Sequence, residues 1–325
     1  MDRPPKLRVA EIAFSAAMLA AILWYLDVRQ IASIMAGADL FFCGLALAAY
    51  FCTMLLMSYR LRRILFELGE KIGFGRAFFS NAAGLLASDF TPARSGYFIT
   101  PFVLSRNAGV AVDKGMAAIV SPQIVEFFLK AAGAAAAIFL LLSSFPELSG
   151  SAIFLWAGVG VMLLFCAGLW AALFSPMAVR LASYFKFLPL VKQGTGFLSS
   201  LQLHSGKVGR IFAWIAGVSS AIFVLKGVEW YFFGLALGVN FSVPIHPFLV
   251  FLVLQPLITV FQFVPFPTIA GFGLSEGSAV ASMALLGVPF EMAIAYSLLV
   301  RAGTTLLDCL GIGQLMPFAF GKKKK

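Results

Sequence analysis

Two polar stretches broken by proline and glycine interrupt the apolar sequence: Asp89-Phe90-Thr91-Pro92-Ala93-Arg94-Ser95-Gly96 and Pro265-Phe266-Pro267-Thr268-Ile269-Ala270-Gly271-Phe272-Gly273-Leu274-Ser275-Glu276. A Gly-Val pair follows each stretch, at Gly109-Val110 and Gly287-Val288, and a long apolar segment comes after each pair. Inside a bilayer, backbone that is not regular helix must be buried in protein or line a cavity. Matching interruptions in two halves of a membrane protein therefore predict a transport-type binding site between the halves.

The composition excludes a soluble domain. Of the 325 residues, 61% are hydrophobic and only 12% are charged, and the mean hydropathy is +0.96. These values are typical of an all-α polytopic membrane protein, and the length allows about six to eight spans of roughly 20 residues. The apolar run after the basic residues 1–8 has no small-residue cleavage site, so we expect Val9–Leu26 to be a retained first span.

The order of apolar segments predicts one transmembrane domain over residues 1–325, in two halves at about 9–145 and 150–318. After the first span, crossings are expected at Leu40–Tyr59, Val112–Ser143, Ala152–Phe174, Ile211–Val239 and Pro289–Phe318. The interrupted zones, about 77–106 and 248–286, have half-length apolar arms around their proline and glycine residues. We therefore favour six transmembrane helices plus two re-entrant hairpins, arranged as an inverted repeat, although eight spans remain open.

Basic residues are distributed as the positive-inside rule requires for two cytoplasmic termini. They gather in residues 1–8, in 60–76, in the loop 175–210 and in the final lysines, 322–325. Arg60 is placed here at the cytoplasmic end of its span. The loops assigned to the opposite face hold only Arg29. The net charge of +10 therefore indicates membrane orientation, and no nucleic-acid partner is expected.

Several ionisable residues fall within the predicted spans, where a charge is costly and its position is by default a functional candidate. Three pairs share helix faces by their spacing: Glu126 with Lys130, Lys226 with Glu229, and Arg301 with Asp308. Gln123 and Arg301 each lie 14 residues after the glycine of a Gly-Val pair. These residues predict a polar site at matched depth in the two halves. The alternative is that they are self-neutralising pairs that hold helices together.

The interrupted stretches contribute further candidates. Arg94 and Gly96 lie in the first, where broken backbone exposes amide groups that suit an anionic head group. Gly271, Gly273 and Glu276 lie in the second. Arg94 and Arg301 are expected to bind phosphate because a guanidinium fork fits its oxygens. Glu126 and Glu276 are expected to contact sugar or amine groups, or to carry a proton. Arg94 could instead be an interfacial loop residue, and Glu276 a first-turn acid.

No cofactor, metal or catalytic centre is expected. The four cysteines, the two histidines and Gly271-Phe272-Gly273 lack metal, redox or nucleotide-binding spacing.

These motifs resemble the lysylphosphatidylglycerol synthase transmembrane-region family, also called the flippase-like domain family. The first matching block is Asn81, Pro92-Ala93-Arg94-Ser95-Gly96, Leu104-Ser105-Arg106, Gln123 and Glu126. The second is Pro267 to Glu276, followed by Arg301. Three positions depart from the family pattern: Tyr97 stands where an acid is usual, Gln123 where an arginine is usual, and Ile269-Ala270 where Pro-Gly is usual.

The resemblance implies a protein of the bacterial inner membrane that moves aminoacylated or glycosylated lipids between leaflets, or that supports an attached synthase. No long soluble segment corresponds to a fused synthase domain, so we expect a flippase that binds a phosphate-bearing lipid and is not an enzyme. Two alternatives remain: a non-transporting partner that docks a cytoplasmic synthase through 175–210, and a head-group-modifying membrane enzyme. A homo-oligomer also remains open.

Overall fold

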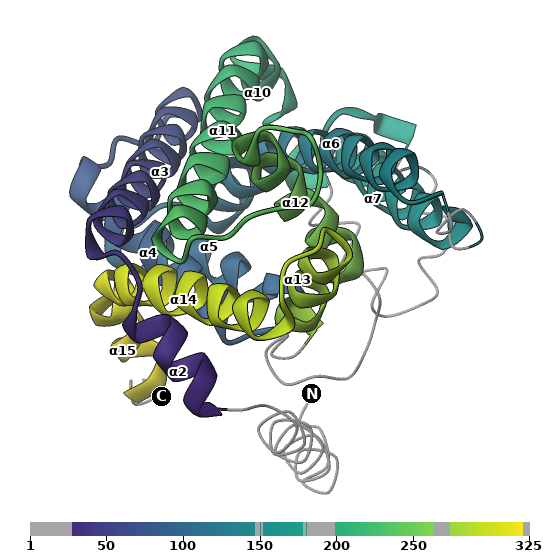
Figure 1. Cartoon of the computed structure of the whole chain (residues 1–325). Helices are drawn as coiled ribbons and strands as arrows, with labels where there is room; N and C mark the ends of the chain where they lie inside the picture. Colours follow the sequence, from purple (N-terminus) through teal and green to yellow (C-terminus); the bar gives the residue numbers. More distant parts are fainter. Residues whose placement is uncertain are drawn as a thin grey trace, which may run out of the picture.

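The computed structural model describes residues 28–146, 150, 152–177, 180, 199–262 and 274–320, and within these ranges the regular structure is entirely helical. The helices are α2 (Val28–Ala36), α3 (Leu40–Glu67), α4 (Phe74–Asp89), η1 (Pro92–Ile99), α5 (Thr100–Ala108), α6 (Val112–Ser144), α7 (Ala152–Phe174), α10 (Ser205–Arg210), α11 (Phe212–Ala236), α12 (Pro247–Gln262), α13 (Leu274–Leu285), α14 (Phe290–Asp308), η4 (Cys309–Gly311) and α15 (Ile312–Phe320). Figure 1 shows their arrangement.

Five helical segments in the described part are long and apolar enough to cross a bilayer: Leu40–Glu67, Val112–Ser144, Leu155–Phe174, Phe212–Ala236 and Phe290–Met316. They coincide with five of the predicted spans and confirm a multi-pass helical membrane protein. The predicted first span, Val9–Leu26, lies outside the described residues, so the total number of crossings stays a prediction.

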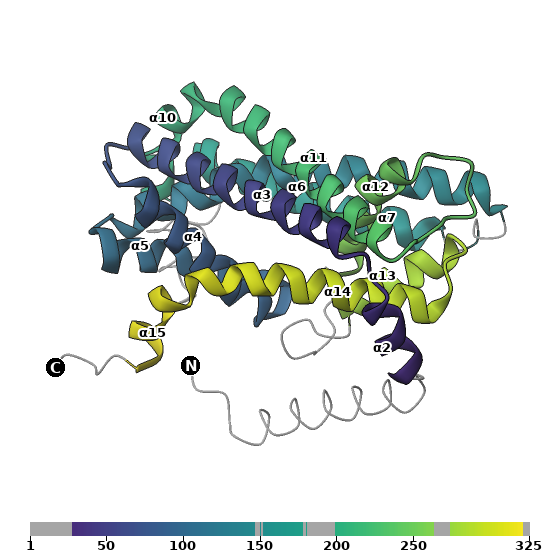
Figure 2. The ribbon, with the colours of Figure 1, turned by 60° about the vertical axis from the view of Figure 1, so that its left-hand side comes forward.

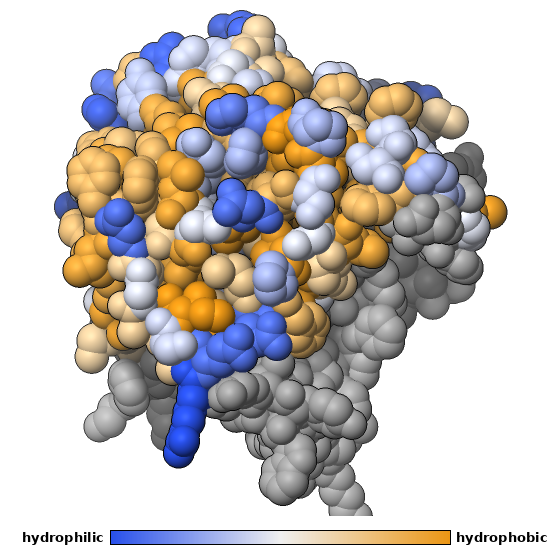
Figure 3. Space-filling view, in the orientation of Figure 1, coloured by the Kyte–Doolittle hydropathy of each residue, from blue (hydrophilic) through white to orange (hydrophobic). Residues whose placement is uncertain are grey.

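The outer surface of these helices is apolar, as contact with lipid requires. Large side chains such as Ile153, Leu164 and Phe139 are each at least 72% exposed. In Figure 3, hydrophobic residues cover much of the visible face, with polar residues in separate groups among them.

Two span boundaries differ from the predictions. The helix predicted to end at Tyr59 continues to Glu67, which takes Arg60 into the helix interior. The last predicted crossing, Pro289–Phe318, is interrupted by the short 3₁₀ turn η4. At that turn a Cβ on Gly311 would lie 2.1 Å from the backbone nitrogen of Ala83, so the chain approaches the backbone of α4 closely there.

The first interrupted zone folds back on itself. Pro92 begins η1, and the Thr91 hydroxyl accepts a hydrogen bond from the Gly96 amide at 2.6 Å. A Cβ on Gly96 would lie 2.2 Å from the Ala87 carbonyl oxygen, and one on Gly84 would lie 1.9 Å from the Thr100 hydroxyl. Glycine is therefore required at both positions for η1 and the start of α5 to pack against α4.

The same order of elements occurs twice along the chain. The long helices α3 and α11 each lead, through a turn, to the 16-residue helices α4 and α12. A second short helix follows, α5 or α13, and then the long helix α6 or α14. Four glycines with positive φ, Gly69, Gly109, Gly238 and Gly287, follow α3, α5, α11 and α13 respectively. A left-handed glycine is a common way to end a helix.

The two leading helices pack side by side and run in opposite directions. The Asp39 amide, just before α3, donates to the carbonyl of Ala236 at the end of α11. Near the other end of α3, Arg60 hydrogen-bonds Ser219, in the first part of α11. Figure 2 shows α3 and α11 together along one side of the molecule. Around them, α6 packs on α12, and α14 with η4 packs on α4.

Candidate functional site

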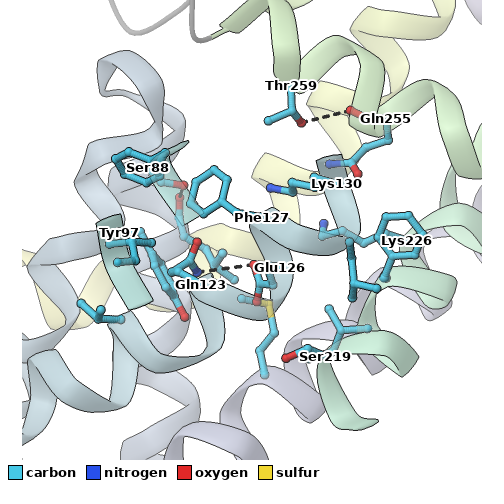
Figure 4. Close-up of a pocket in the computed structure, with 18 of the residues that line it drawn as sticks. Ser88, Tyr97, Gln123, Glu126, Phe127, Lys130, Ser219, Lys226, Gln255 and Thr259 are labelled. Atoms are coloured by element: carbon cyan, nitrogen blue, oxygen red, sulfur yellow. Dashed lines mark hydrogen bonds between the residues drawn. The ribbon is translucent and has the colours of Figure 1, made fainter. Parts of the chain in front are cut away.

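A cavity of about 370 Å³ lies among α3, α4, η1, α6, α7, α11 and α12. Its size falls within the range of small-molecule sites, about 300–1,000 Å³. The polar residues on its wall are Ser88, Ser95, Tyr97, Gln123, Glu126, Lys130, Ser219, Lys226, Gln255 and Thr259. Figure 4 shows Lys130 and Lys226 between the Gln123–Glu126 pair on one side and the Gln255–Thr259 pair on the other.

One side of the cavity is neutralised by a buried ion pair. Arg60 is 2% exposed and donates at 2.6 Å to Glu126 on α6 and at 2.6 Å to the Ser219 hydroxyl on α11. Gln123 donates to the other Glu126 oxygen at 3.4 Å. Glu126 thus has a fixed cationic partner, and Arg60 joins three long helices.

Two lysines supply the remaining charge. Lys130, near the middle of α6, has its ammonium 5.6 Å from the centre of the Phe127 ring. Lys226, near the middle of α11, has its ammonium 4.9 Å from the centre of the Tyr50 ring. It also lies 3.9 Å from a carboxylate oxygen of Glu229, whose side chain is completely buried. The cavity therefore presents ammonium groups at the level of the helix centres.

Apolar side chains make up the other walls, among them Phe98 on η1 and Phe165 on α7. These two rings are 40% and 43% exposed, so each presents a large part of its surface to open space. In the described part of the chain α7 packs mainly on α6. The residues that η1 and α7 contribute to the cavity thus include apolar side chains on both elements.

A second polar cluster joins α14 to α4 and α3. Arg301 donates to the Asp89 carbonyl at 2.7 Å, and Thr305 donates to the Asp89 carboxylate at 3.0 Å. The Tyr50 hydroxyl donates to both oxygens of the buried Asp308, at 2.8 and 2.9 Å. Because the ring of the same tyrosine faces Lys226, Tyr50 connects this cluster with the cavity.

The predicted residues therefore fall into three groups. Glu126, Lys130 and Lys226 line the cavity. Arg301 and Asp308 belong to the second cluster. Glu229 lies behind Lys226, and Gly96 lies between two cavity residues of η1.

The remaining predicted residues are outside what the structure describes. These are Gly271, Gly273 and the side chains of Arg94 and Glu276. The proposed meeting of Arg94 and Glu276 with Arg301 stays a prediction.

Arg60 is the important residue that the sequence prediction misplaced. It was assigned to the cytoplasmic end of a span because it begins a basic run, whereas the longer helix buries it against Ser219 and Glu126. The sequence does contain one indication that Arg60 is a site residue. Arg60 lies nine residues before Gly69, and Glu229 lies nine residues before Gly238, so the two charged residues occupy matching positions in the two halves. Lys130 and Asp308 likewise each lie 21 residues after a Gly-Val glycine, so corresponding positions carry opposite charges.

No group of three or more His, Cys, Asp or Glu side chains that could hold a metal ion occurs among the described residues. A contact of this kind here joins two residues: Nε2 of His204 lies 3.0 Å from a carboxylate oxygen of Asp113.

Comparison with known families gives a match over most of the chain. The sequence model of the family described as the lysylphosphatidylglycerol synthase TM region matches residues 8–311, which is most of the chain. A comparison with curated proteins found no match. The family match confirms the resemblance drawn from the two interrupted motifs.

Proposed function

The chain belongs to the lysylphosphatidylglycerol synthase transmembrane-region family, and we propose that it is a lipid flippase that moves a phosphate-bearing lipid between the leaflets of the membrane. The observation that carries the proposal is the cavity at the level of the helix centres, lined by Lys130 and Lys226. Ionisable groups at this depth are costly and mark substrate pathways.

The charge balance of the cavity favours an anionic guest. Because Arg60 holds Glu126 at 2.6 Å, the carboxylate that lines the cavity is already compensated. We propose that the ammonium groups of Lys130 and Lys226, the second of which also faces Glu229 at 3.9 Å, attract a phosphate. Gln255, Thr259 and Ser88 supply hydrogen-bonding groups for hydroxyls or an amine on the same head group. We therefore propose an aminoacylated or glycosylated phospholipid as substrate.

The acyl chains have an apolar route beside the head group. We propose that they lie between η1 and α7, against Phe98 and Phe165. The lipid would then keep its chains in the bilayer while its head group crosses through the cavity.

The proposed topology is an inverted repeat with six crossings, two re-entrant hairpins and cytoplasmic termini. The twofold order of helices and the antiparallel packing of α3 on α11 support it. At about 1.5 Å per residue, the 16 residues of α4 and of α12 reach about 24 Å, which is less than a bilayer core of about 30 Å. We place the protein in the cytoplasmic membrane of a bacterium, as the family implies.

The test is transport in reconstituted vesicles that carry aminoacylated phosphatidylglycerol with a fluorescent label on an acyl chain. A membrane-impermeant quencher reports the fraction of the label in the outer leaflet. Wild type should move the lipid, and Lys130→Ala combined with Lys226→Ala should abolish movement. Lys114→Ala is the matched control, because Lys114 pairs with Glu70 outside the cavity. Failure of wild type to move the lipid, or full movement by the double variant, would contradict the proposal.

The same vesicles can be analysed by mass spectrometry. A new lipid species would favour a head-group-modifying enzyme, and an unchanged lipid population supports translocation alone.

A further inference from the structure

Tyr97 on η1 is a further polar residue of the cavity wall. Its hydroxyl donates to the side-chain oxygen of Asn81 on α4 at 2.8 Å. The same hydroxyl lies within electrostatic reach of Arg60 and Glu126. Figure 4 shows Tyr97 on the same side of the cavity as Gln123 and Glu126. Tyr97 is therefore at the end of the cavity that the buried ion pair neutralises.

Two contacts with α4 fix the position of the tyrosine. Asn81 and Gly84 lie three residues apart on this helix and so share one of its faces. Asn81 accepts from the hydroxyl, and a Cβ on Gly84 would lie 3.2 Å from the tyrosine ring. Because the hydroxyl hydrogen is directed at Asn81, the Tyr97 oxygen can only accept from any further partner. A guest in the cavity that binds this oxygen must supply a hydrogen-bond donor.

The amide of Asn81 is a costly group to place inside α4. The residue is completely buried, and among the described residues its amide nitrogen has no hydrogen-bond partner. A buried donor without a partner lowers stability, and an apolar side chain of similar size would avoid this cost. Packing of α4 therefore does not explain the asparagine, whereas the orientation of the Tyr97 hydroxyl does.

The charges around the cavity favour one kind of donor. A lipid head group presents donors as hydroxyls or as ammonium groups. Lys130 and Lys226 line the same cavity and repel an ammonium, and Glu126 is already paired with Arg60. An uncharged hydroxyl therefore fits the Tyr97 oxygen better than a cation does. Aminoacylated phosphatidylglycerol retains such a hydroxyl on its glycerol, and a sugar carries several.

We propose that the Tyr97 oxygen accepts a hydrogen bond from a head-group hydroxyl of the lipid, and that Asn81 is the positioning residue that holds the tyrosine for this contact. The inference rests on the proposed function, since it needs a lipid head group in the cavity. It narrows the substrate to phospholipids that carry a glycerol or sugar hydroxyl beyond the phosphate.

The test compares two short-chain lipids of equal charge, dioctanoyl phosphatidylglycerol and dioctanoyl phosphatidylpropanol, which lacks the glycerol hydroxyls. Binding of each lipid to the purified full chain in detergent is measured by calorimetry. Wild type should bind phosphatidylglycerol at least about fivefold more tightly, the effect expected for one neutral hydrogen bond. Tyr97→Phe should weaken phosphatidylglycerol binding about fivefold and leave phosphatidylpropanol binding unchanged.

Changes at Asn81 separate positioning from a purely structural role. Asn81→Leu alone should reduce the preference for phosphatidylglycerol, because the hydroxyl is no longer oriented. Asn81→Leu combined with Tyr97→Phe removes both polar partners, so its melting temperature in detergent should equal or exceed that of wild type. Its preference should still fall as in Tyr97→Phe. A lower melting temperature with an unchanged preference would show that the pair only supports the fold.

Tyr59→Phe is the control, because Tyr59 is exposed on α3 and packs edge-on against Trp214. It should bind both lipids as wild type does. Equal affinity of wild type for the two lipids, or equal weakening of both by Tyr97→Phe, would overturn the inference and leave the proposed function standing. Failure of wild type to bind either lipid would overturn both. The wild-type comparison can overturn the inference even if a variant fails to fold.

Discussion

Arg60 is a buried cation whose contacts cross between helices that lie far apart in sequence. It binds Glu126 on α6 and Ser219 on α11, both at 2.6 Å. Taking away one partner of such a pair leaves the other charge without its compensating ion. The arginine is thus important both for the fold and for the charge of the cavity.

Arg60→Ala should lower the free energy of unfolding by about 3–5 kcal/mol, because Glu126 would remain buried without its cation. Arg63→Ala is the matched control on the same helix; Arg63 forms a partly exposed pair with Glu67, and its loss should cost about 1 kcal/mol or less. Thermal unfolding in detergent measures both. Equal losses for the two variants would show that Arg60 is not the buried partner of Glu126.

Tyr50→Phe should also destabilise the protein, by about 1–3 kcal/mol. The change removes the hydroxyl that donates to both oxygens of the buried Asp308. Tyr59→Phe is the control, because Tyr59 is 46% exposed and packs edge-on against Trp214. Comparison of melting temperatures tests the difference, and an unaffected Tyr50→Phe variant would show that this hydrogen bond contributes nothing.

At the scale of the helical elements, the turns between helices depend on a few glycines. Gly109 has φ +69° and ends α5, and nothing would touch a Cβ placed on it. Any cost of substitution there is conformational and not steric. Gly44 lies inside α3, has no positive φ and is equally open.

Gly109→Ala should therefore cost roughly 1–2 kcal/mol, the usual penalty for a left-handed residue with a side chain. Gly44→Ala, inside a helix, should be neutral or slightly stabilising. Chemical denaturation of the two variants separates these outcomes, and a neutral Gly109→Ala would contradict the left-handed geometry of this turn.

The packing of α6 on α12 depends on Gly133. A Cβ there would lie 2.7 Å from the ring of Pro256, so the two helices approach closely at this point. Gly133→Leu should push α12, which carries Gln255 and Thr259, away from the cavity and abolish lipid movement. Gly160→Leu on α7 has open space and should leave movement intact. Equal transport by the two variants would show that this contact does not shape the cavity.

Most of the helices could be predicted from the sequence, because a membrane-spanning helix is recognisable by its length and high hydropathy. The predicted span Ala152–Phe174 matches α7 to the residue. The end of α3 could not be predicted, because basic residues usually mark a span end and a sequence does not show which of them has a buried acid opposite. Glu126, Lys130 and Lys226 were predictable as costly charges. Tyr50, which faces Lys226, and Ser219, which accepts from Arg60, were not predictable, since both residue types are ordinary in apolar helices.

At the scale of the whole molecule, the twofold order of helices and the antiparallel α3–α11 pair predict which loops share a side. Lys207 and Asn240 lie at opposite ends of α11, and both are exposed. If α11 crosses the membrane, these residues lie on opposite faces.

In a chain whose four cysteines are replaced by serine, Lys207→Cys should react with an impermeant thiol reagent only in inside-out vesicles. Asn240→Cys should react only in intact spheroplasts. Labelling of both positions from one side would contradict a crossing of the membrane by α11.

The central claim is that the cavity holds the head group of a lipid. The measurement that tests it most directly is a cryo-electron microscopy map of the protein in nanodiscs that contain phosphatidylglycerol. The account predicts phosphate density within hydrogen-bonding distance of the Lys130 and Lys226 ammonium groups, with acyl density between Phe98 and Phe165. A cavity that contains only water, with every lipid confined to the outer surface, would contradict it.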